Sequence, residues 1–170
     1  MKGDSILGID PGKTGGFVLL SPGGSILRKE RMPLVGDEID LNALGLMFYE
    51  MSDLVRITFL EKVQGMTFAH GRRQGTSSTF NFGKTYGILV GHLSAFRIPF
   101  ELITPQTWQK QMHVGCSADD AKVRSALAVM KLFPREDFRA TQRSTKPHDG
   151  LIDAALIAEY GRRKMTGQCL

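Results

Sequence analysis

Cysteine is scarce in this chain of 170 residues, and its scarcity limits what can hold the fold together. The two cysteines, Cys116 and Cys169, match no zinc-binding spacing. We therefore expect reduced thiols in a reducing compartment.

Long apolar runs are missing as well. No run of about 18 apolar residues occurs, so we expect no membrane span. The start, Met1-Lys2-Gly3-Asp4, leads into an apolar run too short for a secretory signal. We expect a cytoplasmic protein of a bacterial or phage-infected cell, with an organelle matrix as the alternative. Internal repeats and low-complexity linkers are also absent, which favours a single domain over residues 1–170.

Acidic residues are outnumbered by basic ones. The chain has 22 Lys and Arg against 17 Asp and Glu, a net charge of +5. Such a balance favours a polyanionic partner. Many of the bases fall in the second and third quarters of the chain or shortly after: Arg72, Arg73, Lys84, Lys110, Lys122, Arg124, Arg135, Arg139, Arg143 and Lys146.

The order of apolar patterns predicts an α/β fold. Three strands joined by short Gly/Pro turns should form antiparallel hairpins over 5–10, 15–20 and 25–31. Helices and strands then alternate, which predicts a mixed five-stranded RNase H-like sheet, antiparallel then parallel, flanked by helices. The expected elements are helix 40–54, strand 56–61, helix 79–96, strand 98–103, helix 118–132 with Ser117 as its N-cap, and helix 148–163.

Four carboxylates stand out against this order. Asp10 and Glu61 each end an apolar strand, and Asp149 and Asp153 lie four apart on one face of the last helix. Acids at strand ends and on one helical turn can form an oxygen-rich cage for Mg²⁺, with Mn²⁺ as a substitute. We predict these four residues as catalytic metal ligands.

Each acid also has an ordinary structural explanation. The Asp10 motif could be a simple turn, Glu61 a solvated strand end, and Asp149 an acid suited to a helix N-terminus. Asp153 is harder to explain, since an acid in a nearly apolar helix is costly unless it is paired or bound to metal. His148 could be a helix cap, a phosphate contact or a proton donor, and a surface cap is the interpretation we prefer.

The segment Gly8–Gly15 looks like a phosphate-binding loop but does not fit one. Its glycine spacing is wrong by one residue, and Phe17 to Leu20 continues as a strand where a helix should begin.

The helix over 79–96 carries glycine at every fourth position. Glycine costs about 1 kcal/mol in a helix relative to alanine, so Gly83, Gly87 and Gly91 suggest close packing by the sheet or by a partner helix. The apolar residues of this helix fit either the core or a dimer contact: Phe82, Tyr86, Leu89 and Leu93.

A Gly- and Arg-rich loop follows Glu61 directly. Its Phe68, Arg72 and Arg73 could grip a DNA backbone and stack against bases, or the loop could be an ordinary flexible one. We predict DNA contacts for these three residues and for three further basic residues, Lys84, Arg143 and Lys146.

Taken together, these motifs resemble the RuvC-type Holliday junction resolvases of the RNase H-like superfamily. The resemblance covers most of the chain and is closest to bacteriophage and chloroplast-type members. One departure is the last acidic pair, which is four apart here and three apart in the bacterial enzymes. The similar segments are Ile6–Gly15, Leu60-Glu61, 64–87, Thr104–Lys110, Ser117–Lys122 and His148–Ala154.

The resemblance implies a homodimeric hydrolase that cuts four-way DNA junctions by paired symmetric nicks, using two metal ions. It also implies that two active-site lysines fall on Lys110 and Lys122. No small-molecule cofactor and no membrane partner are expected.

Three other functions stay open from the sequence. An RNase H-fold nuclease could act on other branched DNA or on structured RNA. An actin-like ATPase or sugar kinase begins with a similar strand and turn but needs two such domains. A non-catalytic junction-binding protein would have little reason to keep all four acids.

Overall fold

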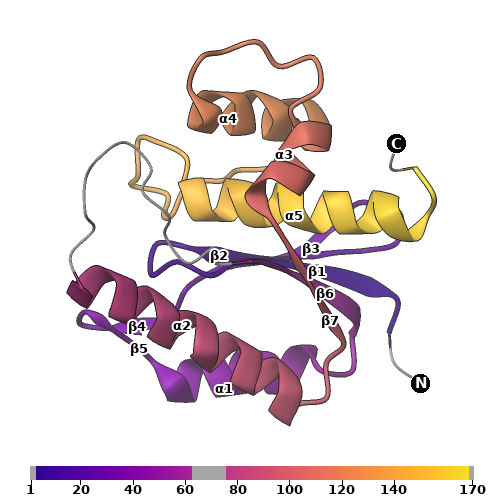
Figure 1. The fold of residues 1–170 in the computed structure, drawn as a ribbon. Coiled ribbons are helices and arrows are strands. Elements are labelled where there is room, and N and C mark those ends of the chain that lie inside the picture. Colours follow the sequence, from indigo (N-terminus) through magenta and orange to yellow (C-terminus); the bar gives the residue numbers. More distant parts are fainter. Residues whose placement is uncertain (1–2, 63–75, 169–170) are drawn as a thin grey trace.

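In the computed structural model, which describes residues 3–62 and 76–168, a mixed five-stranded sheet lies between two helical layers (Figure 1). Side chains 76–79 and 82 lie outside that description, as do the predicted DNA-contacting loop residues Phe68, Arg72 and Arg73. The sheet order is β3-β2-β1-β6-β7. Its strands are β1 Ser5–Asp10, β2 Gly16–Leu20, β3 Ile26–Arg31, β6 Val55–Glu61 and β7 Phe100–Ile103.

The predicted strand directions are confirmed. The strand β1 pairs antiparallel with β2, and β2 antiparallel with β3, because their connecting turns are short. The next two pairs, β1 with β6 and β6 with β7, are parallel. Parallel neighbours put their carboxyl ends at one edge of the sheet, so Asp10 and Glu61 end adjacent strands at the same edge.

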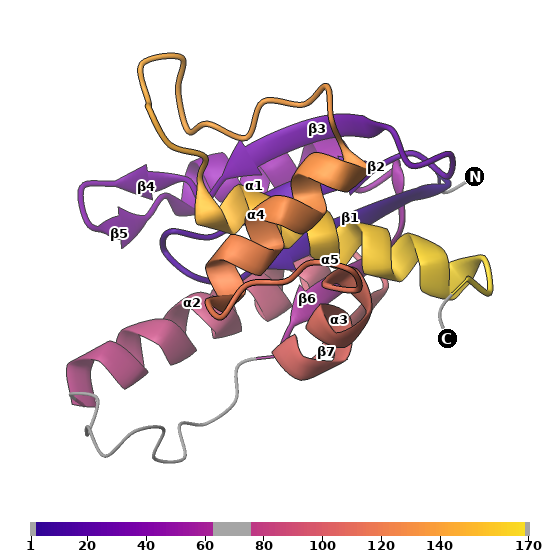
Figure 2. The ribbon, with the colours of Figure 1, turned by 90° about the horizontal axis from the view of Figure 1, so that it is seen from above.

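The helices cover both faces. On one side, α1 Leu41–Met51 and α2 Thr76–Ala95 enclose a core that includes Phe17, Phe48 and Leu89. On the other side α5, Asp149–Met165, crosses the sheet. Seen from above, α3 Pro105–Met112 and α4 Ala121–Leu132 form an outer layer over α5 (Figure 2).

Glycines let α5 approach the sheet closely. A Cβ on Gly8 of β1 would lie 2.2 Å from the Ala154 carbonyl oxygen, and one on Gly150 would lie 2.2 Å from the Thr14 carbonyl oxygen. No side chain fits at such distances, so the start of α5 rests on β1 and on the turn that follows Asp10. This contact brings the acids of α5 to the edge where Asp10 lies.

Three predictions about elements were incomplete or wrong. The helix α4 is capped by Asp120, which accepts from the Lys122 backbone N–H at 2.6 Å, and not by Ser117. The sequence prediction missed α3, which Thr104 caps and Pro105 begins. It also missed the small hairpin of β4 Leu34–Val35 and β5 Glu38–Ile39. Two-residue strands carry too little periodicity to be recognised.

The glycine stripe of α2 does not serve the packing of this chain. A Cβ on Gly83, Gly87 or Gly91 would meet no atom of the described residues within 4 Å, so close contact with the sheet, one of the two predicted explanations, is wrong. The core contacts of α2 come instead from Leu89 and Leu93, which are buried. A separate finding is that no described helix is long and apolar enough to cross a membrane.

Candidate active site

Three of the four predicted acids are partly buried side chains whose charges interact. The pKa of Asp10 is raised to about 6, that of Glu61 to about 7 and that of Asp153 to about 7. In each case burial is the largest cause, because it disfavours the charged form. Repulsion adds to it: Asp149 acts on Asp10, and Asp10 and Asp153 act on Glu61. The sheet edge and the start of α5 therefore hold one mutually repelling group of acids.

Each buried acid receives a hydrogen-bond donor. The Gly12 backbone N–H donates to Asp10 Oδ1 at 3.3 Å, and Trp108 Nε1 donates to Glu61 Oε2 at 2.7 Å. A hydrogen bond from the Ser125 side chain lowers the pKa of Asp153 against the effect of burial. These donors reduce the cost of burying the carboxylates but do not remove it, since all three pKa values stay high.

The fourth acid, Asp149, differs from the other three. Its side chain is half exposed and forms an ion pair with Lys122, Nζ to Oδ2 at 2.7 Å. The cap of α5 is His148, whose Nδ1 accepts from the Leu151 backbone N–H at 3.3 Å, so the preferred interpretation of His148 is confirmed. Asp149 is the first residue of α5 and not its cap.

The predicted cage is not closed in this conformation. Within residues 3–62 and 76–168, no three His, Cys, Asp or Glu side chains lie close enough together to hold a metal ion. One oxygen of Glu61 accepts from Trp108, and one oxygen of Asp149 accepts from Lys122. The donor set nevertheless fits a hard cation such as Mg²⁺ or Mn²⁺, since it consists of carboxylate oxygens. A divalent cation would also offset the repulsion that raises the three pKa values.

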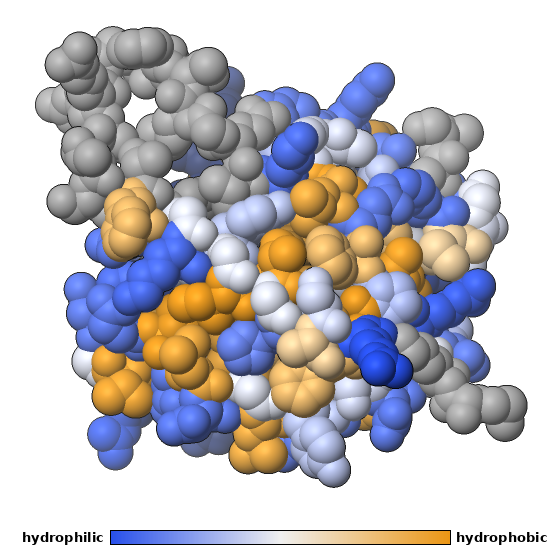
Figure 3. Space-filling model, turned by 60° about the horizontal axis from the view of Figure 1, so that its bottom comes forward, coloured by the Kyte–Doolittle hydropathy of each residue, from blue (hydrophilic) through white to orange (hydrophobic). Residues whose placement is uncertain are grey.

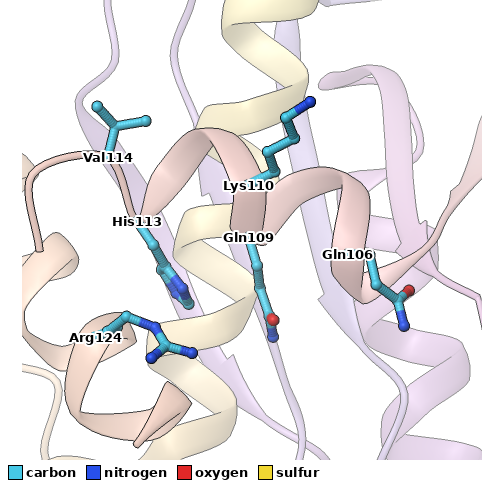
Figure 4. A pocket seen from close by; sticks show the side chains of 6 residues that line it. All are labelled: Gln106, Gln109, Lys110, His113, Val114 and Arg124. Atoms are coloured by element: carbon cyan, nitrogen blue, oxygen red, sulfur yellow. The ribbon is translucent and has the colours of Figure 1, made fainter. Parts of the chain in front are cut away.

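The predicted lysines lie in different surroundings. Lys122 pairs with Asp149 and also acts electrostatically on Asp153, so it lies at the acid group. Lys110 is exposed on α3 at a shallow pocket of about 330 Å³ (Figure 4). In that view Lys110 extends away from Gln106 and Gln109, which point to the other side of α3. His113, Val114 and Arg124 complete the lining.

The three described residues predicted to contact DNA are also separated. Lys84 of α2 pairs with Glu38 of β5, on the opposite side of the sheet from α5. Arg143 and Lys146 are exposed in the loop between α4 and α5, which leads directly to the acids of α5. Two of the three, Arg143 and Lys146, thus lie in the loop that immediately precedes the acids of α5.

Trp108 and Ser125 are site residues that the sequence did not reveal as such. Trp108 is fully buried, and Ser125 is buried on α4. One signal for Trp108 was available, because a buried indole N–H usually needs an acceptor. For Ser125 there was none, since a single serine in a helix has many uses.

The raised pKa values predict that the metal-free protein loses stability as the pH rises. In the unfolded chain these carboxyls ionise near pH 4. Between about pH 4 and about pH 7 the folded protein binds more protons than the unfolded chain does, so its free energy of unfolding falls with increasing pH. In a protein of this size, a change of 1 kcal/mol in the free energy of unfolding shifts the melting temperature by ~2–4 °C. We therefore expect the melting temperature, measured by calorimetry in EDTA, to be about 5 °C or more higher at pH 5.5 than at pH 8.

Asp153→Asn should remove part of this pH dependence, because the amide is neutral throughout the range. Asp37→Asn is the matched control, since the Asp37 side chain is 99% exposed. A melting temperature that rises from pH 5.5 to pH 8 would contradict the burial of these acids.

Comparison with solved structures identifies the class of fold. The chain has the RuvC-type, RNase H-like α/β fold, which confirms the predicted fold and, at the level of the fold, the resemblance to RuvC-type resolvases.

Three of the similar solved structures show how far the match extends. RuvC of T. thermophilus in complex with a Holliday junction substrate matches with a TM-score of 0.62 and 16% identity, covering 96% of this chain and 97% of that one. A second Thermus thermophilus RuvC structure gives 0.59 and 18%, with the same coverage. The yeast mitochondrial Holliday junction resolvase Ydc2 gives 0.61 and 14%, covering 99% and 82%. No family model and no curated protein matches the sequence.

Proposed function

We propose that this protein is a metal-dependent endonuclease that resolves four-way DNA junctions by paired symmetric nicks. The observation that carries the proposal is the group of partly buried, mutually repelling acids from β1, β6 and α5, in a fold shared with junction resolvases. The net charge of +5 suits a DNA substrate. The scarcity of cysteine favours a reducing compartment such as the cytoplasm.

The acids would hold the metal. Asp10, Glu61 and Asp153 are the proposed ligands, and Asp149 would join them on leaving Lys122. When bound, two Mg²⁺ ions would supply an activated water and stabilise the leaving oxygen. The half-exposed ion pair of Asp149 and Lys122 is weak enough to exchange partners, as exposed pairs contribute little.

The lysines would meet the substrate's phosphates. Lys122, beside the acids, would stabilise charge on the phosphate under attack, since a fixed cation is most effective where negative charge develops. Lys110 would act from the exposed side of α3. Arg143 and Lys146 would bind the backbone next to the cut and Lys84 would bind it further away, and Phe68, Arg72 and Arg73 are proposed as additional DNA contacts.

A homodimer would match the two-fold symmetry of the junction. The exposed glycine stripe of α2 favours this, because a second helix could approach it closely. Apolar side chains gather on the same side of the molecule (Figure 3). Among the described side chains of α1 and α2, those with more than half of their surface exposed are Leu41, Leu46, Tyr49 and Phe80.

Cleavage mapping on an end-labelled mobile four-way junction tests the proposal. With Mg²⁺ or Mn²⁺ we expect one nick in each of two opposite strands, at symmetric positions. Linear duplex, flap, fork, structured RNA and RNA:DNA hybrid serve as comparisons at matched concentrations. Preferential cutting of any of these substrates would favour a nuclease of other specificity, and binding without cutting would favour a junction-binding protein.

A further inference from the structure

Two buried donors outside the sheet reach two of the acids. Trp108 of α3 is fully buried, and its Nε1 lies 2.7 Å from Glu61 Oε2. Ser125 of α4 is buried, lies 3.0 Å from His113 Nε2, and its side chain lowers the pKa of Asp153 against the effect of burial. Glu61 belongs to β6 and Asp153 to α5, so each interaction joins the outer helical layer to an element that carries an acid.

His113 connects these two donors. Its Nε2 lies 3.0 Å from the Ser125 hydroxyl oxygen, and its ring packs edge-on against Trp108, with centroids 5.7 Å apart at 82°. The Ser125 hydroxyl therefore links the His113 imidazole to the acid group.

We propose that Trp108 and Ser125 are positioning residues, which restrict the rotation of the Glu61 and Asp153 carboxylates and so favour the binding of a divalent cation. The proposal rests on the proposed metal site. A carboxylate turns easily about its last torsion, which has broad minima, and a fixed donor on one oxygen restricts that rotation. Partners of this kind orient metal ligands, and their removal commonly lowers metal affinity by ~10–100-fold.

Packing alone does not account for the two donors. Phenylalanine would fill most of the Trp108 site without donating a hydrogen bond, and alanine would fit at Ser125. The polar atoms of both residues are instead directed at acids that would otherwise have fewer donors. Asp10 is served in the same way by the Gly12 backbone N–H.

The test measures metal binding by the full chain without DNA. Free Mn²⁺ is titrated by electron paramagnetic resonance, and Trp108→Phe and Ser125→Ala should each weaken binding by ~10–100-fold. Ser125→Thr keeps the hydroxyl and should restore affinity. Thr85→Val is the matched control, because it removes a buried hydroxyl on α2 that donates to the Asn81 carbonyl oxygen, away from the acids.

A second measurement reports on the contact itself. Trp108 is the only tryptophan, so a ¹⁵N correlation spectrum contains one indole resonance. Glu61→Gln should shift that resonance. In the Glu61→Gln background, Trp108→Phe should cause little further loss of Mn²⁺ affinity, since the indole acts through Glu61.

The outcomes separate the positioning role from the metal site. If the wild type binds Mn²⁺ and both variants bind it equally well, the positioning role is wrong while the metal site stands. If the wild type fails to bind Mn²⁺ at millimolar concentration, the metal site and the proposed function fail first. An indole resonance unmoved by Glu61→Gln would overturn the Trp108 assignment even if Ser125→Ala does not fold.

Discussion

Replacing Asp10 with Asn is expected to abolish Mg²⁺-dependent nicking of a four-way junction while leaving junction binding intact. Asp10 lies at the end of the central strand β1, beside Glu61 and within the influence of Asp149. Asparagine has nearly the same shape but carries no charge, so it is a poor ligand for Mg²⁺. Metal ions supply several kcal/mol of transition-state stabilisation, so we expect a loss of ~1000-fold or more. Single-turnover cleavage and gel-shift titration in Ca²⁺ measure the two properties.

The stability of the variant provides an internal check. Because Asp10 is buried with a raised pKa, its neutral replacement should raise the melting temperature of the metal-free protein at pH 8. If Asp10→Asn were inactive because it misfolds, its melting temperature would instead be lower than that of the wild type. Asp37→Asn should change neither cleavage nor binding, and unchanged cleavage by Asp10→Asn would refute the metal mechanism.

Replacing Gly87 with Arg is expected to convert the proposed homodimer into monomers. A Cβ at position 87 meets no atom within 4 Å in the part of the chain that the structure describes, so the substitution should not disturb the fold of the monomer. In a two-fold dimer formed by α2, both copies would place an Arg side chain in one narrow contact. Steric clash and like-charge repulsion of several kcal/mol would raise the dimer dissociation constant by ~100-fold or more. Sedimentation equilibrium measures that constant, and cleavage mapping should show unpaired nicks.

Gly87→Ala is the matched control and distinguishes two roles of the glycine. If α2 is free in solution, alanine should stabilise the helix by up to about 1 kcal/mol and leave unchanged the molecular mass measured by sedimentation equilibrium. If a partner helix packs there, alanine should weaken the dimer as well. A Gly87→Arg variant that sediments as a stable dimer would move the interface to another surface.

Local patterns were sufficient for most of the fold. Neighbouring residues specify the hairpin turns after Asp10 and Leu20, the apolar runs of β1 and β6, and the apolar helix α5. The N-cap of α4 is the helix boundary that the local pattern predicted wrongly. Asp119, Asp120 and Ser117 are all good caps, and only the packed structure selects Asp120.

Local patterns were less informative about the site. Asp153 could be singled out because an acid in an apolar helix conflicts with its neighbours. The pairing of Lys84 with Glu38 could not be predicted, since the two residues belong to different elements 46 positions apart. The same holds for Trp108 and Glu61, which are separated by 47 positions. Helical or strand periodicity tells which face is buried but not which side chain it will meet.

By itself, the sequence determined the order of the five sheet strands and of α1, α2, α4 and α5, the antiparallel and parallel halves of the sheet and the strand ends that carry Asp10 and Glu61. These properties follow from turns and periodicities between near neighbours. Only the tertiary structure decided that three acids are partly buried together, that Asp149 pairs with Lys122, that Trp108 donates to Glu61, and that Ser125 lowers the pKa of Asp153. Burial and hydrogen-bond partners depend on how α3, α4 and α5 pack over the sheet, where contacts join residues far apart in the chain.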